Sequence, residues 1–430
     1  MNPVDTLFVI ISTAMVLLMT PALSLFYGGL VRAKSILNTM MMSLVALGVV
    51  GLLWSFLGYS LAFSPGNVVL GGLDHALLKG LDGSVRDGTT IPSLLFFGYQ
   101  GTFAIITAAL VSGAIVERMR FTAYLAFLGL WTLAVYSPVA HWVWGGGWMH
   151  KLGILDFAGG TVVHITAGTA AWVAATMVGP RENHGRQAFL PHNVPMMLTG
   201  AALLWFGWIG FNGGSALAVN ATAVQATVNT MLAPAAAIVT WMLLDFWRFG
   251  RATAVGAGTA LVVGLVAITP GCGFVSPMAA IIIGALTAIP CQFAIHYRAR
   301  TRLDDSLDVL AAHGTGGVMG AMLTGVFTTE AWGGPAGLLD GNVRQFLLQG
   351  VGVMATIAWT AIATWGILTL IRLVAPLRVS ARAEARGLDV GEHGEEGYSD
   401  GEGAILVLAT PAGLVSATAT YPIPASENGS

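Results

Sequence analysis

Two histidines stand inside long apolar stretches of the sequence, where an ionisable side chain is costly and usually functional. They are His164 and His313, and an acidic residue precedes each of them, Asp156 and Asp308. A neutral imidazole carries one hydrogen-bond donor and one acceptor, so two such rings that meet in an apolar interior can relay a proton or hold a small polar molecule. We expect the two histidines to approach the middle of a membrane from opposite sides and to face each other.

A purely structural role or a metal site could also account for these histidines. A single histidine in a membrane helix often only completes a hydrogen bond between helices, although two in equivalent positions favour a joint role. A zinc site would need further ligands from His, Cys or carboxylate, and the sequence offers none at helical spacing. It also has no Gly-x-Ser-x-Gly elbow and no P-loop. We therefore expect no metal, no cofactor and no enzymatic activity.

An aromatic residue next to a flexible backbone is a second candidate for chemistry. Trp144 is followed by three glycines, at 145–147, and glycine lets the chain bend around a small ligand. The face of a tryptophan attracts a cation by about 0.5 to 2 kcal/mol. The alternative is an ordinary belt of interfacial tryptophans, which would account for most of the 13 in the chain.

The segments that must position these residues are strongly apolar. Apolar residues make up 55% of the 430-residue chain and charged residues only 9%, against about a quarter in ordinary soluble proteins. A stretch of about 20 apolar residues crosses the hydrocarbon core as a helix. The centres of eleven such stretches are Leu17, Gly48, Ile105, Leu128, Thr169, Leu203, Ala235, Gly264, Ile283, Met319 and Ala358. The sequence therefore predicts an all-α integral membrane protein with eleven transmembrane helices in a lipid bilayer.

Basic residues are distributed unevenly between the two sides of this arrangement. Of the 19 Lys and Arg residues, 15 follow odd-numbered segments and only four lie on the opposite side. Positive charge accumulates on the cytosolic side of membrane proteins. We expect an N-terminus outside, a C-terminus in the cytosol, and a first helix, residues 4–30, that is not a cleaved signal peptide. The net charge of −2 argues against nucleic-acid binding.

Weak internal similarity indicates two related halves. Residues 26–29 in the first segment and 211–214 in the sixth both end in Gly-Gly, and the fifth and tenth segments each hold one of the histidines. Five spans per half would invert the second half relative to the first, as in many transporters. The prediction is two inverted five-helix repeats plus a final helix in residues 1–377. A cytosolic regulatory tail at 378–400 and a poorly ordered C-terminal extension at 401–430 would follow.

Several of these motifs resemble the ammonium transporter family (Amt/Rh), and within it the bacterial Amt branch. The most specific is DFAGGTVVHI, at 156–165. The resemblance covers nearly the whole chain, and its other motifs occur in the expected order at 100–103, 140–144, 208–215, 268–273, 308–314 and 387–398. Several long motifs in one order are far more specific than any one of them.

The resemblance implies a transporter or channel that binds ammonium outside, removes a proton and conducts ammonia through an apolar pore. The implied outer recruitment site consists of Phe103, Trp144, Asp156, Trp208 and Ser215. The implied gate is Phe103 stacked on Phe211, and the implied twin histidines of the pore are His164 and His313.

The resemblance also implies partners and a location. These are a homotrimer in the cell membrane, with one pore per subunit, and a cytosolic P-II signal-transduction protein that docks on the inner face. Two alternative functions stay open, an ammonium sensor that signals through its tail and a neutral-gas channel of the Rh type. The sequence shows no fused kinase or cyclase, which disfavours the sensor. The cation site at Trp144 and Ser215 disfavours the gas channel.

Overall fold

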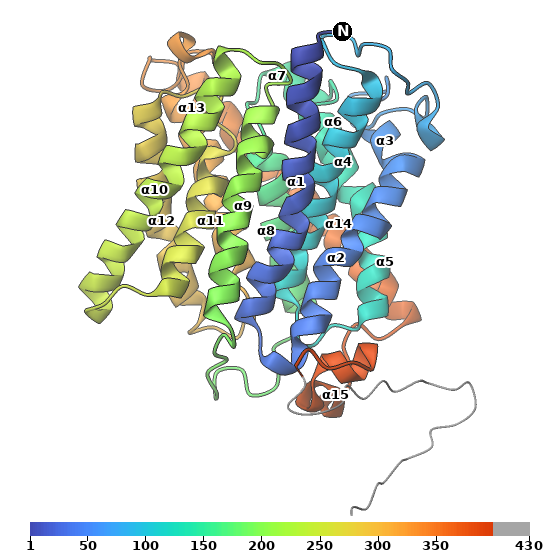
Figure 1. Ribbon diagram of the computed structural model, residues 1–430, viewed down its shortest axis with the longest axis vertical. Helices are drawn as coiled ribbons and strands as arrows, with labels where there is room; N and C mark the ends of the chain where they lie inside the picture. Colours follow the sequence, from blue (N-terminus) through green and yellow to red (C-terminus); the bar gives the residue numbers. More distant parts are fainter. Residues whose placement is uncertain (399–430) are drawn as a thin grey trace, which may run out of the picture.

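The computed structural model describes residues 1–398, and the regular elements within them are helices that stand side by side as a bundle (Figure 1). The elements are α1 (Pro3–Leu30), η1 (Ala33–Ser35), α2 (Ile36–Leu53), η2 (Trp54–Gly58), α3 (Tyr59–Phe63), η3 (Ala76–Leu78), α4 (Ser93–Leu110), η4 (Val111–Ala114), α5 (Phe121–Trp131), η5 (Thr132–Tyr136), α6 (Ser137–Val143), α7 (Trp148–Leu152), η6 (Gly160–Ile165), α8 (Thr166–Val178), α9 (Val194–Gly214), α10 (Ala221–Phe249), α11 (Ala254–Ile268), α12 (Pro277–Arg298), η7 (Leu310–Thr315), α13 (Gly316–Phe327), η8 (Glu330–Trp332), α14 (Val343–Val374), α15 (Ala381–Arg386) and η9 (Asp389–His393).

Eleven apolar helical segments correspond to the eleven predicted spans, and every predicted centre falls inside one of them. Within the described residues, nine segments are long and apolar enough by themselves to cross a membrane. The other two are α11, with 15 residues, and the tenth segment, in which the six residues of η7 continue into the 12 residues of α13. The predicted all-α fold is therefore confirmed.

Polar side chains at the starts of the helices explain where several of them begin. The first N–H groups of a helix have no partner inside it, and a side-chain oxygen at the preceding residue can accept from them. The capping residues are Asn2 for α1, Asn193 for α9, Asn220 for α10, Thr253 for α11, Ser276 for α12 and Asn342 for α14.

The first helices of the two predicted halves, α1 and α9, lie side by side (Figure 1). A Cβ atom on Gly207 would lie 2.8 Å from the carbonyl oxygen of Met15, and one on Gly210 would lie 2.9 Å from that of Ser12. Larger residues at these two positions would push the backbones apart, so glycine permits the contact. This pairing is the one expected of equivalent helices in two related halves.

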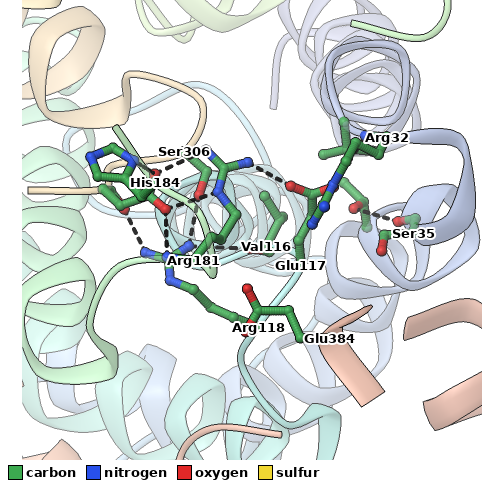
Figure 2. Close-up of polar contacts among 12 residues, drawn as sticks. Arg32, Ser35, Val116, Glu117, Arg118, Arg181, His184, Ser306 and Glu384 are labelled. Atoms are coloured by element: carbon green, nitrogen blue, oxygen red, sulfur yellow. Dashed lines mark hydrogen bonds and ion pairs between the residues drawn. The ribbon is translucent and has the colours of Figure 1, made fainter. Parts of the chain in front are cut away.

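The N-terminus lies at one end of the bundle and α15 at the other, and we call these ends the N-terminal side and the tail side (Figure 1). A buried network of charges joins helix ends on the tail side (Figure 2). Glu117 pairs with Arg32 at 2.7 Å and with Arg181 at 2.5 Å, and Arg181 also pairs with Asp304 at 2.8 Å. The network therefore ties together the ends of α1, α4 and α8 and the approach to η7.

Arg118 reinforces this network from within (Figure 2). Its side chain is fully buried and donates five hydrogen bonds. The acceptors are the backbone carbonyls of residues 114, 116, 179 and 304 and the hydroxyl of Ser306. A buried guanidinium is tolerated when its donors are satisfied in this way.

Residues 378–398 fold back against the same helix ends. Glu384 accepts from the backbone N–H of Glu182. The carboxylate of Asp389 accepts from Asn38 at the start of α2, and that of Glu392 accepts from Phe121 at the start of α5, at 2.8 and 2.9 Å. Acidic groups are stabilised at helix N-termini. Residues 399–400 of the predicted tail, and the whole predicted extension at 401–430, lie outside the described residues.

Candidate functional site

The structure brings the two histidines of the apolar segments, His164 and His313, together inside the bundle. The Nδ1 atoms of His164 and His313 are 3.2 Å apart, and the ring centroids are 5.3 Å apart. One Nδ1 must therefore donate and the other accept. Both residues are buried, with 1% and 4% of their surface exposed. Nε2 of His164 is buried and has no hydrogen-bond partner within residues 1–398.

Each histidine lies in a π-helical turn that continues into a regular helix. His164 belongs to η6, which leads into α8, and His313 belongs to η7, which leads into α13. Such turns are rare and often mark functional sites. Where the two histidine helices cross, a Cβ atom on Gly168 would overlap the backbone of Gly314. Glycine at this position therefore allows the helices to approach closely enough for the rings to meet.

A carboxylate fixes the start of each π-helical turn. The two oxygens of Asp156 accept four hydrogen bonds, from the backbone N–H groups of residues 159–162, at 2.7–3.0 Å. The oxygens of Asp305 accept from residues 309 and 310, at 3.1 and 2.7 Å. Each of these aspartates lies eight residues before its histidine, so the two halves use the same device.

The sequence motifs indicate Asp308 as the counterpart of Asp156 in the second half. In the structure, the residue that plays the same part as Asp156 is Asp305. Asp308 forms an ion pair with Arg298, at 2.6 Å, and lines a cavity on the tail side. The equal spacing of eight residues is the signal in the sequence that identifies Asp305.

A cavity of about 220 Å³ opens on the N-terminal side. It brings together three of the expected recruitment residues, Phe103, Trp144 and Ser215. The indole N–H of Trp144 donates to the backbone carbonyl of Asp156, at 2.9 Å, and the ring of Phe103 meets that of Trp144 edge to face, with centroids 6.1 Å apart. The remaining residues of this outer cavity are Phe96, Gln100, Val143, His150, Phe157 and Leu217.

Gln100 and His150 were not identified as site residues from the sequence. Gln100 stands in one of the motifs of the resemblance, and His150 follows Trp144 by six residues. Proximity to a motif was the only signal for them. The side chain of Asp156 does not line the outer cavity, because both of its oxygens bind the start of η6.

Two stacked phenylalanines close the outer cavity from below. The rings of Phe103 and Phe211 have centroids 4.1 Å apart and planes 28° apart, and each residue is 1% exposed. Phe103 lines the outer cavity, whereas Phe211 lines a central cavity of about 20 Å³. A volume of this size admits about one molecule as large as water.

The central cavity is apolar apart from the histidines. It is lined by Met19, Leu23, Phe26, Tyr27, Ile106, Leu110, Val163, His164, Leu204, Trp208, Phe211, Val262 and His313. The hydroxyl of Tyr27 donates to the carbonyl of Leu110, and the indole N–H of Trp208 donates to Thr269. The histidines therefore supply the free polar atoms of this cavity.

The resemblance implies that Trp208 belongs to the outer recruitment site. In the structure, Trp208 lines the central cavity instead. Its ring stacks on His164, with centroids 5.3 Å apart. Because α9 runs from the tail side toward the N-terminal side, a residue before Phe211 lies below the stacked phenylalanine pair and not above it.

Beyond His313, an inner cavity of about 550 Å³ opens on the tail side. Its polar lining includes Arg181, His184, Arg298 and Asp308. His313 belongs to the lining of both the central and the inner cavity. The outer cavity, the phenylalanine pair, the histidine pair and the inner cavity thus follow one another in this order from the N-terminal side to the tail side.

Comparison with known proteins agrees with this arrangement. A family model described as "Ammonium Transporter Family" matches residues 7–398. The ammonium transporter of Bacillus subtilis (strain 168) is 44% identical over 400 residues, which cover 92% of this chain and 98% of that protein. The ammonium transporter of Aquifex aeolicus (strain VF5) is 46% identical over 401 residues, which cover 92% and 93%.

Solved structures give the same result. The crystal structure of Saccharomyces cerevisiae Mep2 is similar with a TM-score of 0.84 and 36% identity, and the match covers 89% of this chain and 88% of Mep2. A structure described as "Sensor Amt Protein" is similar with a TM-score of 0.85 and 31% identity, covering 91% and 98%. Since both sequence and fold match over almost the whole chain, this multi-pass membrane protein belongs to the ammonium transporter family, which consists of transporters and not enzymes.

Proposed function

We propose that this transporter binds ammonium in the outer cavity, removes a proton there and conducts ammonia through the central cavity past His164 and His313. The observation that carries the proposal is the order of the compartments. A cavity with aromatic faces and a hydroxyl is followed by a closed phenylalanine pair, and then by an apolar space of about 20 Å³ that holds two histidines.

Solvation decides which species can pass. A bare cation that enters an apolar space loses its water, which is very costly, whereas neutral ammonia avoids most of this penalty. Potassium has no proton to lose, so the same barrier excludes it. A narrow apolar cavity therefore selects for ammonium because ammonium can become neutral before it enters.

The outer cavity has the groups that a small cation needs. The face of Trp144 attracts positive charge. The hydroxyl of Ser215 donates its proton to the carbonyl of Phe211, at 2.8 Å, so its lone pairs are available to accept from an ammonium N–H. Gln100 also lines this cavity, and its side-chain oxygen is buried without a hydrogen-bond partner within residues 1–398.

The histidine pair would offer a hydrogen bond to ammonia and a path for the proton. Nε2 of His164 would accept the proton that ammonium loses, and the Nδ1–H of His164 would then pass a proton to Nδ1 of His313, which borders the inner cavity. The same Nε2 atom, once neutral again, can bond an ammonia molecule in the central cavity. Asp156 contributes by fixing the π-helical turn that carries His164. Its oxygens already accept four N–H groups, and this favours a supporting role over that of proton acceptor.

Ammonium-evoked currents in proteoliposomes, with potassium as the control ion, test this mechanism. We expect His164→Ala and His313→Ala to abolish selective ammonium transport, because they remove the free polar atoms of the pore. His75→Ala is the matched control, since His75 lies in a loop on the N-terminal side, and within residues 1–398 its ring bonds the carbonyl of Lys79 and packs against Tyr59. A folded His164→Ala or His313→Ala variant with normal transport and potassium exclusion would contradict the proposal.

We also propose the oligomeric state, location and orientation that the family suggests. The protein would be a homotrimer in the cell membrane, with its N-terminus outside and residues 1–377 as the transmembrane domain. The 15 basic residues on one side support this orientation. Cysteines introduced near the N-terminus and near Arg382 should react only with reagents added outside and inside, respectively. An N-terminus that is labelled from inside would overturn the orientation.

Residues 378–400 would form a regulatory tail for a cytosolic P-II signal-transduction protein. The docking of Asp389 and Glu392 on the starts of α2 and α5 supports this role, because a partner that moves the tail would uncover both helix ends. Truncation after Val379 should remove inhibition by the partner, whereas truncation after Asp400 should not. A transporter truncated after Val379 that still responds to the partner would exclude the tail as the coupling element.

An ammonium sensor is the second candidate function. Similarity to the solved "Sensor Amt Protein" and the docked tail support it. Binding of ammonium without either a current or a change of pH inside the proteoliposomes, together with a change in the accessibility of the tail, would favour the sensor over the transporter.

A further inference from the structure

A third histidine, His150, lies at the outer cavity and takes no part in the proposed transport mechanism. It belongs to the short helix α7 (Trp148–Leu152), which begins directly after the three glycines that follow Trp144. It lines the same cavity as Trp144 and Ser215, and the residue is exposed. A titratable group therefore borders the space in which ammonium would bind.

Contacts with its surroundings hold α7 in place. The backbone N–H of Trp148 donates to the carbonyl of Val68, at 3.0 Å, and the ring of Trp148 packs against that of Trp142, with centroids 5.7 Å apart. Met149, the residue next to His150, is fully buried. Fixed contacts on α7 therefore determine the position of the His150 backbone at the cavity.

The ring of His150 is available to a ligand, unlike the rings of two other histidines on the N-terminal side. Both ring nitrogens of His141, on the neighbouring helix α6, bond backbone carbonyls, at 2.8 and 2.9 Å. The ring of His75 bonds the carbonyl of Lys79. Within residues 1–398, the ring of His150 forms no such hydrogen bond with the protein. A neutral imidazole has one nitrogen that accepts, so His150 can accept an N–H of ammonium.

Within residues 1–398, His150 is the one titratable side chain among those that line the outer cavity. Three charged groups lie near this cavity without lining it. Lys151 follows His150 and is exposed, and the oxygens of Asp156 bind the start of η6. The guanidinium of Arg86 lies 3.9 Å from the ring centre of Phe96, on the wall of the cavity. The charge on the cavity wall therefore changes when His150 gains or loses a proton.

We propose that His150 makes the binding of ammonium in the outer cavity depend on pH, an inference that rests on the proposed function of this cavity. Neutral His150 accepts an N–H of ammonium, whereas protonated His150 repels the cation. Histidine changes its charge between about pH 5 and 8, and ammonium stays protonated throughout this range. A sphere with the volume of this cavity is about 7 Å across, and two unit charges at that separation in a cavity open to water change an affinity about threefold to tenfold. Ammonium therefore binds more weakly as the medium becomes acidic.

Ammonium-evoked currents in proteoliposomes at about pH 7.5 and about pH 5.5, with equal pH on both sides, test this role. The ammonium concentration that gives half-maximal current in the wild type should rise about threefold to tenfold at the lower pH. His150→Gln keeps an acceptor but has no titratable charge, so its value should change by less than about twofold. His150→Lys carries a fixed charge and should need at least about threefold more ammonium than His150→Gln at the higher pH. His75→Gln is the matched control and should keep the wild-type shift, because His75 does not line the outer cavity.

Calorimetric titration of ammonium into the detergent-purified protein at the same two pH values separates this role from the transport mechanism. A protein that gives no current but binds ammonium with the expected shift would contradict the proposed function and support the role of His150. Both His150 variants should lose the shift, so either one decides the question if the other does not fold.

Three results would overturn the role of His150. The first is an equal affinity of the wild type for ammonium at the two pH values. The second is a shift that the His150 variants keep or that His75→Gln also loses, since the effect would then not depend on the histidine in the cavity. The third is a shift in the current without one in the affinity, because this would assign the pH dependence to a step after binding.

Discussion

The carboxylate of Asp156 holds the start of the turn that carries His164, and its replacement by asparagine tests how that histidine is positioned. Asparagine has nearly the same size, but it has one oxygen and one NH2 group. The oxygen can keep two of the four N–H contacts, whereas the NH2 group faces two other donors. Each lost hydrogen bond to a charged group is worth about 1.5 to 3 kcal/mol. Asp156→Asn should therefore reduce the free energy of unfolding by about 3 to 6 kcal/mol.

Asp305→Asn is the matched comparison in the other half of the molecule. Within residues 1–398, the side chain of Asp305 accepts two N–H groups, one on each oxygen, so asparagine loses one contact and should cost about 1.5 to 3 kcal/mol. Denaturant unfolding of the purified protein in detergent measures both values. The reasoning is refuted if Asp156→Asn stays within about 1 kcal/mol of the wild type, well below that range, or if Asp305→Asn costs more. A stable Asp156→Asn variant that binds ammonium but does not conduct would instead make Asp156 a proton acceptor.

Three further predictions concern the outer cavity, the helix crossing and the buried charges. Trp144→Leu should raise the ammonium concentration that gives half-maximal current by about 2- to 30-fold, because it removes about 0.5 to 2 kcal/mol of cation–π attraction; unchanged concentration dependence would place the cation elsewhere. Gly168→Ala should separate the histidine helices, because the added methyl group would overlap Gly314, and folded protein with normal current would contradict this. Burial alone would raise the pKa of Glu117, but its two arginine partners outweigh burial and lower it. A lowered pKa stabilises the fold above the unfolded value of about 4.3, and this contribution is lost as pH falls through the folded value. The difference in unfolding free energy between wild type and Glu117→Gln should therefore be constant from pH 7 to about 5 and shrink below about pH 4, and a difference that grows on acidification would reverse this assignment.

The number and type of helices could be predicted from the sequence because length and hydropathy are local properties. Each predicted centre depends on about 20 neighbouring residues, and the alternation of basic loops checks the count independently. The meeting of His164 with His313 could also be expected, since an imidazole in an apolar span needs a partner. The π-helical turns could not be predicted, because their hydrogen-bond pattern depends on the packing of η6 and η7 in the folded molecule.

The errors at the site have a common physical cause. Assigning a residue to the outer cavity or the central cavity requires its depth along the helix, and motif membership does not give that depth. Trp208 and Phe211 are three residues apart, which is about 4.5 Å along a helix, and the phenylalanine pair to which Phe211 belongs marks the upper end of that interval. The role of Asp305 depends on which N–H groups its carboxylate reaches, and no property of the residue type distinguishes it from Asp308, three positions later.

The helix that carries His164 is held at both ends by charged groups, and the group at its tail-side end lies next to a residue that contacts the tail. Asp156 binds the start of its π-helical turn, and Arg181, three residues after the end of α8, pairs with Asp304 ahead of the turn that carries His313. Glu384 of the tail binds the backbone N–H next to Arg181. Removing one partner of a buried ion pair costs about 3 to 5 kcal/mol, so the network is stiff. Under the proposed regulatory role of residues 378–400, a displacement of the tail would act first on the ends of the two histidine helices, through Glu384, Glu182 and Arg181.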